Sequence, residues 1–181
     1  MPVYQPREDS FLIFNSMRIP AGADVLDMGT GTGLLAIEAA RRARRVVAAD
    51  KSHEAVEYTK SACRRMNARN IEVIQSDLFE KVAGQFDVIL FNPPYLPADA
   101  DPRSNDAAWT GGETGQEVIW RFARDAREHL KESGAIFLVV SSHTGIDETA
   151  KMLKDMKYAV SAVAEERFSF EKLVLLELRA V

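Results

Sequence analysis

The sequence contains one cysteine, Cys63, among its 181 residues. A single thiol excludes an internal disulfide and a zinc site made of several cysteines. The three histidines are scattered and lack the spacing of metal ligands, so we predict no metal site. Internal repeats, low-complexity tracts and linkers are also missing, and 46% of the residues are hydrophobic. This composition predicts one well-buried α/β domain over residues 1–181.

Long apolar runs are absent as well. No stretch reaches the roughly 20 residues that a transmembrane helix requires. The N-terminal MPVYQPREDS has neither the basic start nor the apolar core of a signal peptide, so a cytoplasmic location is expected. Positive charge is not in excess, because the net charge is −4. This balance argues against broad phosphate-backbone binding as the main source of affinity, although it leaves room for a local basic patch.

Apolar runs alternate with helical patterns from about residue 24 onward. The alternation predicts a doubly wound, mostly parallel seven-stranded sheet that ends in an antiparallel hairpin. The predicted strands are Asp24–Met28, Arg45–Asp50, Ile71–Gln75, Phe86–Asn92, Ala135–Ser141, Tyr158–Glu166 and Phe170–Arg179. Helices are predicted after Asp50, between Gly115 and Gly134, and over Ile146–Met156, with Gly134 as the C′ residue of its helix.

The tetrapeptide Asn92-Pro93-Pro94-Tyr95 directly follows the apolar run Phe86–Phe91. Two prolines remove two backbone donors and leave nearby carbonyls free. Free carbonyls beside an asparagine amide and a flat ring form a receptor for a planar NH2 group. The alternative interpretation is a proline-rich surface loop. The long segment that continues to Thr114 contains Trp109, which either packs this loop or lines the target pocket.

A glycine-rich turn follows the first predicted strand and precedes a helix. Gly29, Gly31 and Gly33 have the spacing G-x-G-x-G, whereas a nicotinamide enzyme would have G-x-G-x-x-G, and position 34 is Leu. The acidic Asp27 before the turn would repel a pyrophosphate but suits a cationic ligand.

Carboxylates also end the next two predicted strands. Asp50, followed by Lys51, lies 23 residues after Asp27, where an acid can bind ribose hydroxyls, and Asp77-Leu78 could bind an adenine. Asp50 as a helix cap and Asp77 as a turn residue are the alternatives. Three consecutive strand ends thus carry an acid, and the fourth carries Asn-Pro-Pro-Tyr. This arrangement nevertheless favours a nucleoside that carries a positive centre as the ligand.

Together these residues resemble class I S-adenosylmethionine-dependent methyltransferases with a Rossmann-like fold. Two further stretches narrow the resemblance to the archaeal and eukaryotic branch of the HemK-like release-factor glutamine methyltransferases: Tyr4-Gln5-Pro6-Arg7-Glu8-Asp9-Ser10 and Trp109-Thr110-Gly111-Gly112-Glu113-Thr114-Gly115. Gln116 departs from the pattern, because that branch often has a basic residue there. Bacterial members carry a helical substrate-binding domain before the catalytic one, so this chain is expected to be of the compact type.

The resemblance implies an S-adenosylmethionine site covered by residues 1–23. Ser10 would contact the methionine part of the cofactor, Asp27 its amino group, Asp50 with Lys51 the ribose, and Asp77 with Leu78 the adenine, around Gly29 and Gly31. In the acceptor site, the Asn92 side-chain oxygen and the Pro93 carbonyl would accept the two N–H bonds of the target amide. Tyr95 would pack on that amide, with Pro94 and Trp109 nearby.

The implied substrate is the Gln of a Gly-Gly-Gln tripeptide in a class 1 translation termination factor. A small zinc-containing activator is an implied partner, with the edge strand Ile71–Gln75 as its candidate docking site. Alternative acceptors are the amino groups of adenine (N6) or guanine (N2) in nucleic acid, and protein lysine. A nucleotide-binding scaffold without catalysis and a nicotinamide dehydrogenase are less favoured.

Overall fold

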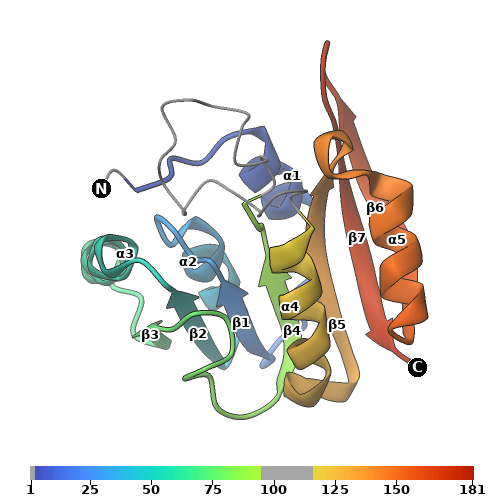
Figure 1. Ribbon diagram of the computed structural model, residues 1–181. Coiled ribbons are helices and arrows are strands. Elements are labelled where there is room, and N and C mark those ends of the chain that lie inside the picture. The colour runs from blue at the N-terminus through green and yellow to red at the C-terminus, as the bar shows by residue number, and fades with distance from the viewer. Residues whose placement is uncertain (1–2, 95–115) are drawn as a thin grey trace.

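The computed structural model describes residues 3–94 and 116–181. A seven-stranded sheet of order β3-β2-β1-β4-β5-β7-β6 crosses the molecule, with helices on both faces (Figure 1). The strands are β1 (Asp24–Met28), β2 (Arg45–Asp50), β3 (Ile71–Gln75), β4 (Phe86–Phe91), β5 (Leu130–Ser141), β6 (Tyr158–Arg167) and β7 (Lys172–Ala180). The α-helices are α1 (Glu8–Ser16), α2 (Leu34–Ala40), α3 (His53–Met66), α4 (Glu117–Ala126) and α5 (Ile146–Asp155).

The pairing of the strands confirms the predicted fold class. Strands β1 to β5 pair in parallel, and β7 runs antiparallel to both β5 and β6. Strand β3 lies at one edge of the sheet, as expected, and β6 lies at the other. Within the described parts of the chain, no helix is long and apolar enough to cross a bilayer.

The central strands are buried on both faces, which explains their continuous apolar runs. Alternate side chains of β1 and β4 enter two separate core layers. One layer, with Leu26 and Ile89, packs against α4 and α5. The other, with Val25 and Val88, packs against α1 and α2. Helix α3 packs near the β2–β3 edge.

The prediction that Gly134 ends a helix is wrong. Helix α4 ends at Ala126, a 3-10 turn follows over Arg127–His129, and Gly134 lies within β5. The β4–β5 pairing is irregular here, since Phe86 pairs with Leu130 but Val88 pairs with Ala135. A Cβ atom on Gly134 would lie 2.7 Å from the Leu130 Cδ1 atom. The glycine therefore permits close packing at a strand irregularity rather than a helix end.

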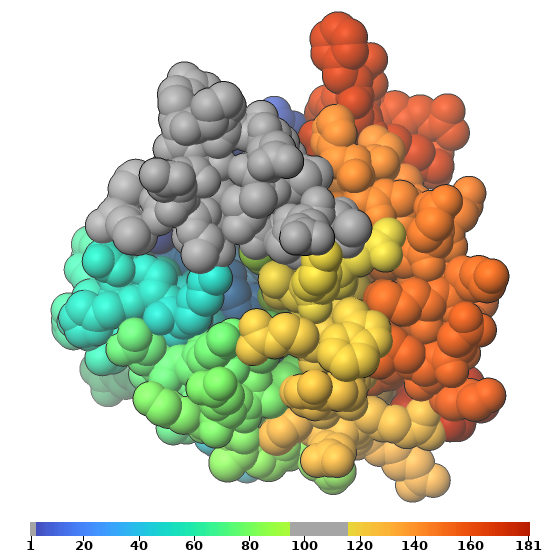
Figure 2. Space-filling view, viewed as in Figure 1, coloured from blue at the N-terminus to red at the C-terminus, as the bar shows by residue number. Residues whose placement is uncertain are grey.

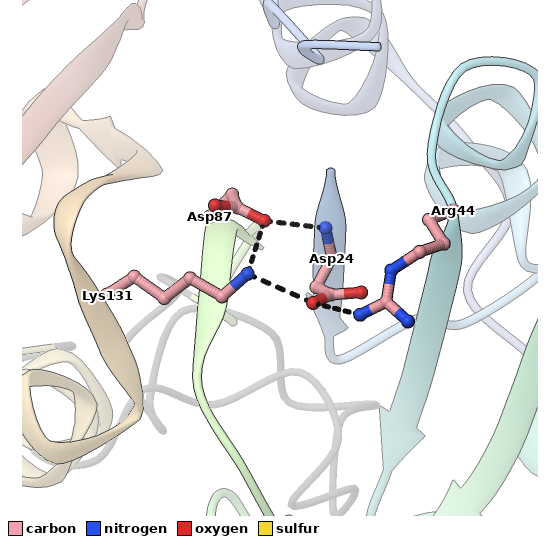
Figure 3. Close-up of polar contacts among 4 residues, drawn as sticks. All are labelled: Asp24, Arg44, Asp87 and Lys131. Carbon is pink, nitrogen blue, oxygen red and sulfur yellow. Dashed lines mark hydrogen bonds and ion pairs between the residues drawn. The ribbon is translucent and has the colours of Figure 1, made fainter. Parts of the chain in front are cut away.

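Four charged residues form an ion-pair network at the amino ends of β1 and β4 (Figure 3). The Lys131 Nζ atom donates to Asp24 Oδ2 at 3.0 Å and to Asp87 Oδ2 at 2.7 Å, and Arg44 donates to Asp24 Oδ2 at 2.7 Å. Burial raises the pKa of the Asp24 carboxyl, but the hydrogen bonds from Lys131 and Arg44 outweigh burial and hold that pKa below its usual value. The network thus joins β1, β4 and β5 at one end of the sheet, and the predicted site lies at the other end.

Replacing Lys131 by Met is expected to lower the free energy of unfolding by about 1–2 kcal/mol, because two carboxylates lose a shared cation. The effect is smaller than for a fully buried pair since the Lys131 side chain is 38% exposed. A lowered folded-state pKa stabilises the protein above the unfolded pKa, so the loss should shrink below about pH 4. Urea unfolding at pH 7 and at about pH 3, below the ordinary carboxyl pKa of 3.8, measures it, with the exposed pair variant Lys60→Met as control. Equal losses for both variants would contradict this account.

Candidate functional site

A cavity of about 810 Å³ opens at the carboxyl ends of β1, β2 and β4. This is the position where open α/β sheets bind ligands, and the volume is typical of small-molecule sites. The N-terminal segment closes one side of the cavity, with Tyr4 and Ser10 among its lining residues. Predicted site residues that line the cavity are Ser10, Gly29, Gly31, Asp50, Lys51, Asp77, Leu78, Asn92, Pro93 and Pro94.

The glycine turn between β1 and α2 is shaped by helix α3. Gly33 has a φ of +82°, and a Cβ atom placed on it would lie 2.9 Å from the Thr59 Cγ2 atom. The buried Thr59 hydroxyl donates to the Gly31 carbonyl at 2.9 Å. Both glycines lie in the left-handed region, where other residues are strained. The turn can therefore bring its backbone close to a ligand in the cavity.

Asp50 lies at the end of β2, beside this turn. Its Oδ2 atom accepts the Gly31 backbone N–H at 3.0 Å, and its Oδ1 atom accepts the Ser52 N–H at 2.9 Å. These bonds fix the carboxylate at the cavity wall, and each oxygen keeps capacity for a further donor. Ser52, rather than Asp50, is the N-cap of α3, because its side chain accepts from Ala55.

The third predicted acid, Asp77, lines the cavity with its neighbour Leu78. The Asp77 Oδ2 atom accepts from Arg121 of α4 at 3.0 Å, an interaction that no sequence motif indicates. Leu78 has a φ of +49°, which is uncommon for a residue with a Cβ atom. The Ser76 hydroxyl donates to the Leu78 carbonyl at 2.8 Å and helps to hold this conformation. The turn after β3 therefore presents an apolar side chain and a carboxylate to the same cavity.

Asp27 lies behind the glycine turn rather than in the cavity lining. Its Oδ2 atom accepts from the Thr30 hydroxyl at 2.6 Å and from the Ala36 backbone N–H at 3.1 Å. Burial raises the pKa of Asp27 to about 7, and the nearby Asp50 charge adds to the rise. Asp27 thus braces β1 against α2, and its predicted contact with the amino group of the methyl donor stays a prediction.

The Asp27→Asn variant is expected to change how stability depends on pH. The folded pKa is about 7, above the unfolded value, so the folded state binds more protons than the unfolded state between those values. Wild-type stability should fall across that range by up to about 1.4 kcal/mol per pH unit and then level off. Asn cannot titrate, so the variant should lose this slope. Urea midpoints at pH 5, 6, 7 and 8 measure it, and parallel curves for the two proteins would contradict the assignment.

Asn92 is the first residue after β4 and lines the cavity. Its Nδ2 atom donates to the Ser10 hydroxyl at 3.4 Å, which ties the end of β4 to helix α1. Its Oδ1 atom is buried and has no hydrogen-bond partner among the described residues. An unpaired buried acceptor costs about 1–3 kcal/mol, so the arrangement is expected where a ligand supplies the missing donor.

Part of the predicted acceptor site lies outside the described residues. This part consists of Tyr95, Trp109 and the Trp109–Gly115 stretch. Gln116 is described, and its Nε2 atom donates to the Thr144 carbonyl at 2.5 Å, which joins α4 to the turn before α5. The lining residues that sequence motifs do not indicate include Arg121, Phe168 and Glu171. The last two come from the β6–β7 turn, which no motif links to the strand ends.

Comparison with known proteins identifies the relatives of this chain. Residues 8–170 match the methyltransferase small domain family. A Methanocaldococcus jannaschii protein named for protein N5-glutamine methyltransferase activity is 39% identical over 178 residues, which cover 96% of this chain and 90% of that protein. Mouse methyltransferase HEMK2 is 31% identical over 167 residues, covering 84% and 78%. The structure of E. cuniculi Mtq2, solved with Trm112 and described as responsible for methylation of the termination factor eRF1, is 25% identical, covers both chains fully and superposes with a TM-score of 0.78.

Proposed function

The chain belongs to the methyltransferase small domain family, and from this premise we propose that it methylates the side-chain nitrogen of the glutamine in a Gly-Gly-Gln sequence of a class 1 termination factor. The observation that carries the proposal is the Asn92 Oδ1 atom in the cavity lining, which is buried and has no hydrogen-bond partner within residues 3–94 and 116–181. The relatives supply the acceptor class, since one is named for N5-glutamine methylation and another is described as acting on eRF1.

The cavity residues fit S-adenosylmethionine as the methyl donor. Asp50 offers anchored carboxylate oxygens for the ribose hydroxyls, and Leu78 with Asp77 offers an apolar wall and an acceptor for the adenine. The glycine turn leaves room for close approach of the methionine part, next to Ser10. When bound, the sulfonium supplies an electrophilic methyl group. The acids at the strand ends suit its positive charge better than the negative charge of a dinucleotide pyrophosphate.

Positioning is the main contribution that the protein can make to this reaction. An amide nitrogen is a poor nucleophile because its lone pair is delocalised, and correct orientation of two reactants can contribute roughly 7–11 kcal/mol. Asn92 Oδ1 accepts one N–H of the target amide, and the Pro93 carbonyl accepts the other. Both acceptors also stabilise the positive charge that develops on the nitrogen. Tyr95, outside the described residues, completes this acceptor site in our proposal by packing on the amide plane.

The exposed edge of β3 is the proposed docking site for a small activator protein. Its side chains are half-buried or exposed, and three of them, Ile71, Val73 and Ile74, are apolar. A free strand edge offers unpaired backbone groups to a second chain. The E. cuniculi relative was solved together with Trm112, which supports an activator of this kind. The same strand ends beside Asp77, so a bound activator would contact the side of the sheet that forms the cofactor pocket.

A labelled-methyl assay tests the proposed function. The purified chain, with and without an activator, is offered a class 1 termination factor, its Gln→Ala variant in the Gly-Gly-Gln sequence, and bulk nucleic acid. We expect label on the factor with an intact Gly-Gly-Gln sequence, and none on its Gln→Ala variant or on nucleic acid. Label that appears only on nucleic acid would favour an amino-methyltransferase acting on bases and overturn the choice of acceptor.

A further inference from the structure

The turn between β6 and β7 presents aromatic side chains beside the cavity. It rises at the end of the sheet where β1 and β4 also end (Figure 1) and forms the projection at the top of the space-filling view (Figure 2). Phe168 and Glu171 of this turn line the cavity. Phe170 points away from the protein, with 93% of its surface exposed. One short turn therefore joins the cavity wall to an exposed ring.

Hydrogen bonds fix the shape of this turn. The Phe168 backbone N–H donates to the Glu171 carbonyl at 2.7 Å and closes it. The Glu171 Oε1 atom accepts from the Ser141 hydroxyl at 2.6 Å, and Ser141 is completely buried at the end of β5. The turn is thus attached to the centre of the sheet. Phe170 therefore lies in a turn whose ends are fixed on either side of it by Phe168 and Glu171.

A fully exposed phenylalanine at this position contributes nothing to the core of the protein. Burying such a ring against a partner is favourable, and buried aromatic rings are typical anchors of protein–protein interfaces. Phe168, which is 41% exposed, lines the cavity, and Phe170 lies two residues further along the same turn. Because Phe168 and Asn92 line the same cavity, a macromolecule that places an acceptor group at Asn92 comes near this turn.

The charges around the ring distinguish protein from nucleic acid as the partner. Arg167 and Lys172 flank the turn, and both pair with Glu165, at 3.3 Å and 2.7 Å. Residues 165–172 contain three acids and two bases, a net charge of −1. Aromatic residues that bind nucleic acid by stacking are normally accompanied by a positively charged groove. An apolar pocket on a folded protein is the better match to this ring.

On the basis of the proposed function, we propose that the β6–β7 turn is a docking element for the protein that carries the acceptor glutamine, and that Phe170 inserts into an apolar pocket on that protein. The docking contact lies outside the reacting groups. It should therefore affect the binding of the intact acceptor protein but not the binding of the methyl donor or the transfer to a short peptide.

The test compares Phe170→Ser, Phe170→Leu and a control, Val163→Ser, which removes another exposed apolar side chain from the same hairpin. Steady-state kinetics use the intact termination factor and a short Gly-Gly-Gln peptide. We expect Phe170→Ser to raise KM for the intact factor about tenfold, in proportion to the apolar burial lost, with kcat retained. Leu should recover part of the loss. Val163→Ser and all peptide kinetics should match wild type.

Several results would overturn the proposal. Equal KM values for wild type and Phe170→Ser with the intact factor would show that the ring does not dock, while leaving the proposed function standing. An equal loss with peptide and factor would place the effect in the acceptor site rather than in docking. If wild type labels a different protein, the kinetics are run with that protein, so the docking role survives or fails independently of the substrate proposal. Label confined to nucleic acid would overturn both.

Discussion

Replacing Asn92 by Ala is expected to lower kcat by about 10²–10³-fold or more, the loss seen when one group that stabilises developing charge is removed. The Asn92 Oδ1 atom is buried and unpaired among the described residues, so it is the acceptor available to the target amide. Binding of S-adenosylmethionine should change little, because the Asp50 and Leu78 sides of the cavity remain intact. Single-turnover kinetics and calorimetry measure the two effects separately.

Two variants sharpen this test. Asn92→Asp keeps an acceptor oxygen at the same position and should retain more activity than Asn92→Ala. Ser10→Ala removes the 3.4 Å contact with the Asn92 Nδ2 atom but leaves the Oδ1 atom in place. It therefore reports how much of the effect comes from the N-terminal segment. Turnover by Asn92→Ala equal to that of wild type would refute the assigned role.

The Asp50→Ala variant is expected to weaken S-adenosylmethionine binding by about 100-fold or more, because hydrogen bonds to a charged group are each worth about 1.5–3 kcal/mol. The substitution also removes the acceptor for the Gly31 and Ser52 backbone N–H groups, so the glycine turn loses a support. Titration calorimetry with S-adenosylmethionine and with the demethylated product measures the change.

The matched control is Glu72→Ala on the neighbouring β3. This carboxylate is 56% exposed and pairs with Arg45 away from the cavity, so its loss should leave cofactor affinity unchanged. An Asp50→Ala protein that binds the cofactor as tightly as wild type would show that the anchored carboxylate does not contact the ribose. Equal weakening in both variants would indicate a general effect of removing negative charge.

The fold could be predicted from the sequence because apolar runs and turn residues agree with each other. The continuous run Phe86–Phe91 is the pattern of a strand buried on both faces, and the observed strand covers this run, one residue shorter than the predicted Phe86–Asn92. The prediction failed at Gly134, where a glycine after a helical pattern was interpreted as a helix end. A glycine is required at this position because the Leu130 side chain packs against it where the β4–β5 pairing is irregular. This contact depends on the pairing register and cannot be read from local sequence.

The site was predictable to the extent that it is built from strand ends. Three different strands of one parallel sheet carry a site residue at or just after their carboxyl ends: Asp50, Asp77 and Asn92. Topology alone therefore brings these residues to one cavity. The exact surroundings of each acid depend on three-dimensional packing. The hydrogen bonds that Asp27 accepts from Thr30 and Ala36, for example, cannot be read from its place after the first strand. The Phe168–Glu171 turn could not be predicted because its position at the mouth depends on how the C-terminal hairpin adds to the sheet.

The most direct test of the central claim is a crystal structure of the protein with the demethylated cofactor and a Gly-Gly-Gln peptide. The account predicts that the glutamine side-chain nitrogen lies about 3 Å from Asn92 Oδ1, a hydrogen-bond distance, and points toward the cofactor sulfur. A glutamine bound elsewhere, or an Asn92 Oδ1 atom that accepts a hydrogen bond from the protein instead of from the glutamine, would contradict it.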